Sequence, residues 1–233
     1  MINNDDGVSM SVDYCDHLHN GTKHNKGKTH NEIQFKVIVV GEQGVGKTSL
    51  IKRHVNGEYA STTKPTIGVD FAIKKHKIDR NTYAVVQYWD IAGQERFHKM
   101  TRVYYDRAVA ALVVFDITKP QTFHAVEKWK NDIDQKVFLP DMQPITCILV
   151  GNKADIVNHY KIPMEDISNF CRQRGFDAFF ETSASLNKNV EQCFKFLVKQ
   201  VLKKNGSTLP REECDCIRLD RPVRNRTDDY YCC

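Results

Sequence analysis

The stretch that decides the fold of this chain is Gly41-Glu42-Gln43-Gly44-Val45-Gly46-Lys47-Thr48. It follows the apolar run of residues 35–40 and precedes a helix-like segment that opens at Ser49. Glycines in this pattern let the backbone curl so that successive N–H groups point at phosphate oxygens, and the following helix dipole adds to the attraction. The stretch therefore predicts a phosphate-binding loop between a strand and a helix; an ordinary glycine-rich turn is the alternative.

Two side chains of this loop have predicted roles of their own. Lys47 is expected to reach the terminal phosphates of a nucleotide and to neutralise charge during catalysis, and the Thr48 hydroxyl is expected to bind Mg²⁺. The residues of this segment expected to contact the nucleotide are Gly41, Gln43, Gly44, Val45, Gly46, Lys47, Thr48 and Ser49.

A second motif predicts which base is bound. The apolar run of residues 145–150 ends in Gly151-Asn152-Lys153-Ala154-Asp155. Asp155 can accept hydrogen bonds from the N1–H and the 2-amino group of guanine, whereas adenine offers neither donor and would leave the carboxylate unpaired. A solvated Asn-Lys turn would explain this motif in isolation. Its position after the phosphate loop favours a guanine nucleotide.

Three further segments complete the predicted site. In Trp89-Asp90-Ile91-Ala92-Gly93-Gln94-Glu95, Asp90 is expected to hold the hydration shell of Mg²⁺, Gly93 to offer its N–H to the γ-phosphate, and Gln94 to orient an attacking water. Thr66, within Lys64-Pro65-Thr66-Ile67-Gly68, supplies a second hydroxyl for the metal. In Glu181-Thr182-Ser183-Ala184, the Ala184 N–H is expected to reach the guanine O6.

These motifs, in this order, resemble the small GTPases of the Ras superfamily over roughly residues 33–204. Ile67-Gly68-Val69-Asp70-Phe71, Trp89 before Asp90, and Gln94-Glu95-Arg96-Phe97 are similar to the Rab family. Four stretches also resemble the Rab branch that serves lysosome-related organelles. They are Trp89-Asp90-Ile91-Ala92-Gly93-Gln94, Met100-Thr101-Arg102-Val103-Tyr104-Tyr105, Lys128-Trp129-Lys130-Asn131-Asp132 and Leu139-Pro140.

The resemblance implies a function and its partners. It implies a GTP-binding, GTP-hydrolysing switch of vesicle and organelle traffic, slow without an activating protein, with Mg²⁺ as cofactor. The implied location is the cytoplasmic face of endosomal or lysosome-related membranes, and the cytosol when escorted. The implied partners are GTP and GDP, an exchange factor, a GTPase-activating protein, a Rab escort protein, a dissociation inhibitor and effectors.

The resemblance also assigns residues that the motifs alone do not. Further nucleotide contacts are implied for Tyr59, Asn152, Lys153 and Ser183, and an effector surface for Ile67, Phe71, Trp89 and Tyr104. Plain core packing, or interface packing between the two segments that would change with the bound nucleotide, is the alternative for the aromatic residues Phe71, Trp89 and Tyr104. One departure concerns Ser185, which stands where the family usually has a lysine whose stem packs against the guanine ring.

The pattern of apolar residues agrees with this fold independently of the resemblance. Apolar, β-branched runs at residues 37–40, 108–115 and 145–150 are typical of strands buried on both faces. Amphipathic segments alternate with them near residues 48–55, 123–137, 164–174 and 190–202. We therefore expect an α/β fold with a doubly wound, mostly parallel six-stranded sheet flanked by helices, whose ligands bind at the carboxyl ends of the strands.

The two ends of the chain have a different composition. Residues 1–32 are polar and predicted to be a disordered extension, and residues 205–233 a flexible tail ending in Tyr230-Tyr231-Cys232-Cys233. Tyr230 occupies the position that a C-a-a-X box requires to be cysteine, so Cys232 and Cys233 instead resemble the doubly geranylgeranylated ending of many Rab proteins. Two lipid chains anchor a protein stably where one does not. Reversible acylation of Cys214 or Cys216, and zinc binding by Cys15 with nearby histidines, are weaker possibilities.

Composition also excludes several classes. The eight cysteines are scattered without a framework, which indicates reduced thiols, and no apolar run approaches transmembrane length. The net charge of +5 is spread along the chain without a basic-aromatic module, so no nucleic-acid partner is expected. Two rival functions stay open: a nucleotide-binding scaffold with negligible hydrolysis, and a P-loop ATPase or nucleotide kinase, which Asp155 disfavours.

Gln43 affects the expected rate of hydrolysis. It occupies a loop position where Ras proteins have glycine, and its amide is expected to project toward the γ-phosphate, into the space that Gln94 needs. Crowding there predicts a long-lived GTP state, because small misplacements cost large factors in a positioned reaction. The alternative is that Gln43 points into solvent.

Overall fold

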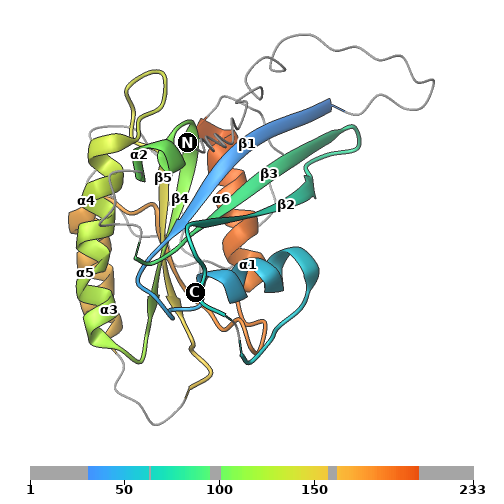
Figure 1. Cartoon of the computed structure of the whole chain (residues 1–233). Coiled ribbons are helices and arrows are strands. Elements are labelled where there is room, and N and C mark those ends of the chain that lie inside the picture. Colours follow the sequence, from blue (N-terminus) through green and yellow to red (C-terminus); the bar gives the residue numbers. More distant parts are fainter. Residues whose placement is uncertain (1–30, 63, 95–100, 157–161, 205–233) are drawn as a thin grey trace, which may run out of the picture. The chain divides into compact units, whose positions relative to one another are not determined.

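The computed structural model describes residues 31–62, 64–94, 101–156 and 162–204 (Figure 1). These residues build a six-stranded sheet with the order β2-β3-β1-β4-β5-β6. The strands are β1 (Asn31–Val40), β2 (Val69–Lys77), β3 (Thr82–Ile91), β4 (Ala108–Asp116), β5 (Thr146–Asn152) and β6 (Ala178–Glu181). β2 pairs with β3 in antiparallel fashion, and the other neighbouring strands are parallel. The predicted fold class is confirmed.

Helices cover both faces of the sheet. They are α1 (Lys47–Asn56), α2 (Thr101–Tyr105), α3 (Pro120–His124), α4 (Val126–Lys136), α5 (Met164–Arg174) and α6 (Val190–Lys204). α1 and α6 lie on one face, and α3, α4 and α5 on the other (Figure 1). The amphipathic segment expected near residues 123–137 corresponds mainly to α4. A separate short helix, α3, precedes it and begins at Pro120, where a missing N–H is no loss.

The hydrophobic core is split by the sheet into two clusters. Phe35, Val37 and Val39 of β1 pack in the cluster that includes α1 and α6. Ile38 and Val40 pack in the cluster that includes α4 and α5. This alternation follows from the two-residue period of a strand, and it shows that β1 is buried on both faces, as its apolar run indicates.

Three features of the fold differ from the sequence-based expectations. β1 begins at Asn31, inside the residues 1–32 expected to form the polar extension, because Asn31 and Glu32 continue the parallel pairing with Thr82 and Tyr83 of β3. Neither β2 nor α2 was predicted. β2 is an edge strand whose residues are mostly exposed or half-buried, so it lacks the apolar signal of the central strands. The rest of the predicted N-terminal extension and the C-terminal tail lie outside the described residues.

A buried polar cluster joins α1 to the sheet and to α6. His54 of α1 contacts Glu191 of α6 at 2.9 Å through Nδ1, and its Nε2 lies 3.4 Å from Nε2 of His76 on β2. The hydroxyl of Tyr88 on β3 lies 3.0 Å from His76 Nε2. The cluster thus ties the last turns of α1 to β2, β3 and α6.

The cluster predicts how stability depends on pH. Burial lowers the pKa of His54, and burial together with the neighbouring His54 lowers the pKa of His76 from 6.5 to about 4. The unfolded chain therefore binds protons more readily than the folded one, so the free energy of unfolding should fall as the pH decreases from about 6.5 toward 4. Urea unfolding at a series of pH values should show a flatter dependence for His76→Gln, and parallel curves would contradict this.

Candidate functional site

The predicted motifs meet at one edge of the sheet. The loop of residues 41–46 follows β1, and α1 begins directly after it. Polar side chains stand at or just after the carboxyl ends of the strands that run parallel to β1: Asp90 on β3, Asp116 on β4, Asn152 on β5 and Ser183 after β6. Because these strands are parallel, their carboxyl ends lie at the same edge, which is where ligands bind in such folds.

Asn152 connects the phosphate loop with the segment after β6. Its Nδ2 donates to the carbonyl of Val45 at 2.9 Å, and its Oδ1 accepts from the Ala184 N–H at 3.3 Å. Gly46 has φ = 97°, and a Cβ there would lie 2.3 Å from Asn152 Nδ2. Glycine is therefore required at position 46 both for its backbone conformation and for the close approach of Asn152.

Lys47 is the first residue of α1 and is buried against the loop. Its ammonium donates to the carbonyls of Gly41 and Glu42 at 2.8 and 3.0 Å, and only 6% of its surface is exposed. Burial lowers its pKa to about 8, while the charges of Asp90 and Glu42 oppose that shift. Lys47 is thus held beside the N-terminus of α1, where an anion would receive both the ammonium charge and the helix dipole.

Three oxygen-bearing side chains meet beside this helix start. The Thr48 hydroxyl donates to Asp90 Oδ2 and lies 2.9 Å from the hydroxyl of Thr66. Thr66 comes from the connection between α1 and β2, and its hydroxyl lies 3.4 Å from the same carboxylate oxygen. Burial raises the pKa of Asp90, although Thr48 and Lys47 counteract this. Among the described residues, the buried Oδ1 of Asp90 has no hydrogen-bond partner.

Gly93 and Gln94 lie against the phosphate loop. A Cβ on Gly93 would be 2.3 Å from the backbone nitrogen of Gln43, so a larger residue would push the two segments apart. The Nε2 of Gln94 donates to Oε1 of Gln43 at 3.1 Å, and both side chains are exposed. The two glutamines that the crowding hypothesis concerns are therefore in direct contact.

The residues expected at the base form a second polar group. Ser183 Oγ donates to Asp155 Oδ1 at 2.6 Å. Partial burial raises the pKa of Asp155, but the hydrogen bond from Ser183 and the influence of the nearby Ser185 hydroxyl outweigh it, and the pKa lies below its ordinary value. Lys153, at φ = 69°, forms an ion pair of 2.9 Å with the buried Asp116. Tyr59 is 43% exposed, with the Arg53 guanidinium 5.6 Å from its ring.

The residues predicted as an effector surface are only partly brought together. Phe71 and Trp89 face each other across β2 and β3 with perpendicular rings 4.5 Å apart. Trp89 and Tyr104 also pack against the same core cluster, which is the alternative named for them, whereas Phe71 is 57% exposed. Ile67 is 93% exposed.

The remaining residues that were predicted to contact the nucleotide, Gly41, Gly44 and Ser49, lie along the phosphate loop and the first turn of α1.

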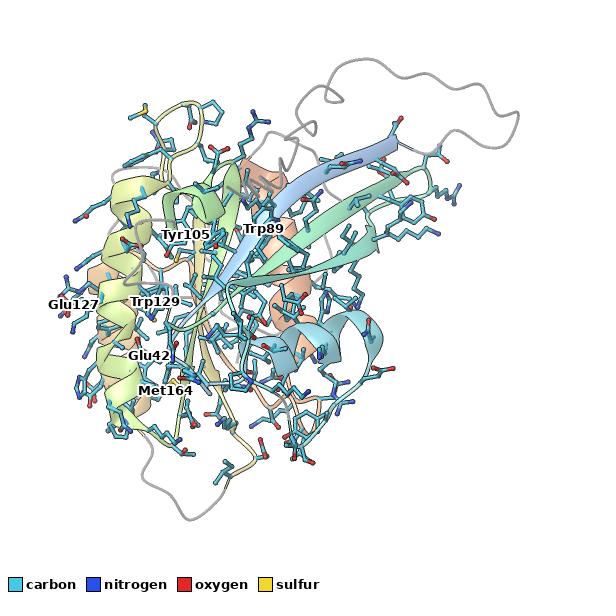
Figure 2. All side chains as sticks on the ribbon, in the orientation of Figure 1. Glu42, Trp89, Tyr105, Glu127, Trp129 and Met164 are labelled. Atoms are coloured by element: carbon cyan, nitrogen blue, oxygen red, sulfur yellow. The ribbon has the colours of Figure 1, made fainter. Side chains whose placement is uncertain are left out.

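Two contacts at the site were not predicted. The first is the ion pair between Asp116 and Lys153. Asp116 stands at the end of an apolar run, and this position could have identified it as a site residue. Trp129 of α4 donates through Nε1 to Oε1 of Glu42 at 3.2 Å, and the two side chains lie side by side in Figure 2. Nothing local in the sequence indicates that contact, because α4 and the phosphate loop are far apart along the chain.

Some predicted residues lie outside the described part of the chain. They are Glu95, Arg96 and Phe97 of the third motif, Met100, Cys15 with the nearby histidines, Cys214, Cys216, and the terminal Cys232 and Cys233.

The fold and the site define a class of protein. A glycine-rich loop between β1 and α1, with Asp90, Asn152 and Ser183 at the same edge of a mostly parallel sheet, is the arrangement of a P-loop nucleotide-binding protein. The chain belongs to the Ras family, whose sequence model matches residues 36–203.

Relatives place the chain within that family. It is 47% identical over 204 residues to human (Homo sapiens) Ras-related protein Rab-32, covering 87% of this chain and 90% of the relative. It is 48% identical over 176 residues to Rab-32A of Dictyostelium discoideum, covering 75% and 80%. It is 39% identical over 201 residues to human Rab-7L1, covering 85% and 97%. The predicted resemblance to the Rab family is confirmed, and the chain is a small GTPase similar to Rab-32.

Proposed function

We propose that the chain is a GTP-dependent switch of vesicle and organelle traffic, which recruits effectors in the GTP state and releases them after hydrolysis. The observation that carries this proposal is the meeting of Thr48, Thr66 and Asp90 beside the start of α1. Thr66 belongs to the connection between α1 and β2, so a ligand bound beside Thr48 and Asp90 would order that connection. Nucleotide switches change their partner-binding surface by ordering and releasing such segments.

The same three residues fit a magnesium ion. Two hydroxyls and a carboxylate are hard oxygen ligands, and the buried Oδ1 of Asp90 has no other partner among the described residues. Thr48 and Thr66 would hold the ion directly and Asp90 through its hydration shell. When bound, Mg²⁺ neutralises charge on the β- and γ-phosphates and polarises them toward attack.

The chain's own residues supply positioning and charge. Lys47 binds the terminal phosphates, and Gly93, packed against the loop, offers its N–H to the γ-phosphate. Gln94 orients the water that attacks. At the guanine base, Asp155 accepts hydrogen bonds from the N1–H and the 2-amino group, and the Ala184 N–H donates to O6. Further contacts with the nucleotide come from Asn152, Lys153, Ser183 and Tyr59. No arginine occurs in residues 58–66, so an activating protein supplies the missing charge.

The cellular part of the proposal rests on the family and the chain terminus. Geranylgeranyl groups on Cys232 and Cys233 anchor the protein to the cytoplasmic face of endosomal or lysosome-related membranes, and Ile67, Phe71, Trp89 and Tyr104 meet effectors. An exchange factor, a GTPase-activating protein, a Rab escort protein and a dissociation inhibitor complete the cycle. Among the described helices, none is long and apolar enough to span a bilayer.

Three measurements test this proposal. Displacement of a fluorescent GDP analogue by GTP should need orders of magnitude less nucleotide than displacement by ATP, and equal potency would favour a P-loop ATPase or kinase. Single-turnover phosphate release should be slow alone and faster with an activating protein. Fluorescent localisation of the full chain beside the double variant Cys232→Ser, Cys233→Ser tests the membrane anchor, which should be lost.

The role of Gln94 can be tested by Gln94→Leu, which keeps the volume and removes the amide. We expect intrinsic GTP hydrolysis to fall at least about tenfold, because the attacking water loses its orienting group. Phosphate release in a single turnover measures this. Gln143→Leu, the same change on an exposed loop, is the matched control. Unchanged hydrolysis in Gln94→Leu would place the water elsewhere.

A second candidate function is a nucleotide-binding scaffold with negligible intrinsic hydrolysis. The hydrogen bond from Gln94 Nε2 to Gln43 Oε1 favours it, because this bond uses one of the Gln94 donors and restrains the amide that would have to orient a water. In this case, phosphate release would stay negligible even with an activating protein, while partners would still bind the GTP form.

A further inference from the structure

Ser185 belongs to a chain of hydrogen bonds that leads through Ser183 to Asp155, the residue expected to bind the guanine base. Its hydroxyl lies 3.0 Å from the hydroxyl of Ser183, which itself donates to Asp155 at 2.6 Å. The backbone N–H of Leu186 also donates to Ser183 Oγ at 3.0 Å. Ser183 has one proton and two lone pairs, so once it donates to Asp155 it can only accept from Ser185 and Leu186.

The position of Ser185 is held from a distant element. Arg53 of α1 donates through Nε to the carbonyl of Ala184 at 2.8 Å and through Nη2 to the carbonyl of Ser185 at 3.0 Å. A third bond, from Nη1 to the carbonyl of Gly57 at 2.7 Å, ties the same guanidinium to the end of α1. The planar guanidinium fixes these donors relative to one another, so the backbone of residues 184 and 185 is restrained beside Asp155.

We propose that Ser185 is a guanine-positioning residue, which acts through the Ser183 hydroxyl to fix the orientation of the Asp155 carboxylate. This inference rests on the proposed function, because it assigns the orientation to a guanine nucleotide. The hydroxyl of Ser185 takes the place of the lysine stem that the resemblance leads one to expect. It supports the base-binding carboxylate by hydrogen bonding rather than by packing against the ring.

The orientation matters because guanine presents two donors side by side. A carboxylate that accepts from both must lie in one plane with them, whereas a carboxylate that accepts from one donor can rotate to suit it. Hypoxanthine, the base of inosine diphosphate, keeps the N1–H and lacks the 2-amino group. A loss of orientation should therefore weaken GDP more than inosine diphosphate.

The experiment measures dissociation of fluorescent GDP and inosine diphosphate from the full chain in Mg²⁺. Ser185→Ala should release GDP about three to ten times faster, the effect of losing one hydrogen bond in a charged network, and inosine diphosphate with a smaller change. Ser185→Thr keeps the hydroxyl and should restore the wild-type ratio of the two rates. Ser168→Ala on α5 removes the same atom away from the site and serves as the control.

The outcomes separate this inference from the function on which it rests. The positioning role is supported if Ser185→Ala brings the dissociation rate of GDP closer to that of inosine diphosphate and Ser185→Thr restores the wild-type ratio of the two rates. Equal acceleration for both nucleotides would assign Ser185 a merely structural role and overturn the inference, and so would no change for either. A wild-type chain that bound ADP as tightly as GDP would overturn the proposed function itself.

Discussion

Gln43→Gly should speed intrinsic GTP hydrolysis by between about fivefold and a hundredfold. The lower figure corresponds to releasing Gln94 from one ordinary hydrogen bond, since such a bond contributes about 1 kcal/mol. The upper figure corresponds to relieving a misplacement of about 1 Å in a positioned reaction. The structure supplies the contact, 3.1 Å from Gln94 Nε2 to Gln43 Oε1. GDP dissociation should not change, because the guanine pocket is not involved.

A second substitution separates the two causes. Gln43→Leu removes the acceptor and keeps the bulk, so it should speed hydrolysis if capture of Gln94 dominates and leave it slow if crowding dominates. Single-turnover phosphate release gives the rate, and dissociation of a fluorescent GDP analogue checks the pocket. A Gln43→Gly rate that stays level or falls would refute both causes.

Thr48→Asn should weaken GTP binding by roughly tenfold to a hundredfold more than GDP binding. The substitution removes the hydroxyl that donates to Asp90 and lies 2.9 Å from Thr66, and hydrogen bonds to charged groups contribute about 1.5–3 kcal/mol. Under the proposed function, the loss falls mainly on GTP, because the γ-phosphate would order the segment that carries Thr66. The variant is therefore biased to the inactive state.

The control for Thr48→Asn is Thr48→Ser, which keeps the hydroxyl and should behave like the wild type. Affinities for GTP and GDP are measured by competition at several free Mg²⁺ concentrations, and the difference between them should shrink as Mg²⁺ rises. An equal loss of affinity for both nucleotides would count against a role for Thr48 at the metal.

Three buried strands could be located from the sequence, β4 and β5 with nearly correct bounds and β1 only in its second half, and three of the helices were predicted with nearly correct bounds. Apolar runs identify β1, β4 and β5 because both faces of these strands are buried, and α5 coincides with the expected residues 164–174. The pattern fails where burial is incomplete. β2 is an edge strand with exposed residues such as Phe71 and Ile73, so its sequence carries no clear period.

The nucleotide motifs were predictable because each is local. Gly46, Lys47 and Thr48 are adjacent, and their chemistry follows from a loop that enters a helix. The role of Asp116 was missed because Lys153, its partner, lies on another strand end. Glu42 was likewise assigned no contact, although its carboxylate accepts from Trp129.

The sequence by itself determined the class of fold, the order of the motifs and the preference for a guanine nucleotide, because backbone conformation and residue chemistry within a short segment decide these. Only the tertiary structure decided which distant side chains touch. The contacts of Gln43 with Gln94 and of Arg53 with Ser185 join segments far apart along the chain. They arise because parallel strands bring their carboxyl ends to one edge, and packing then sets the distances on which rate and specificity depend.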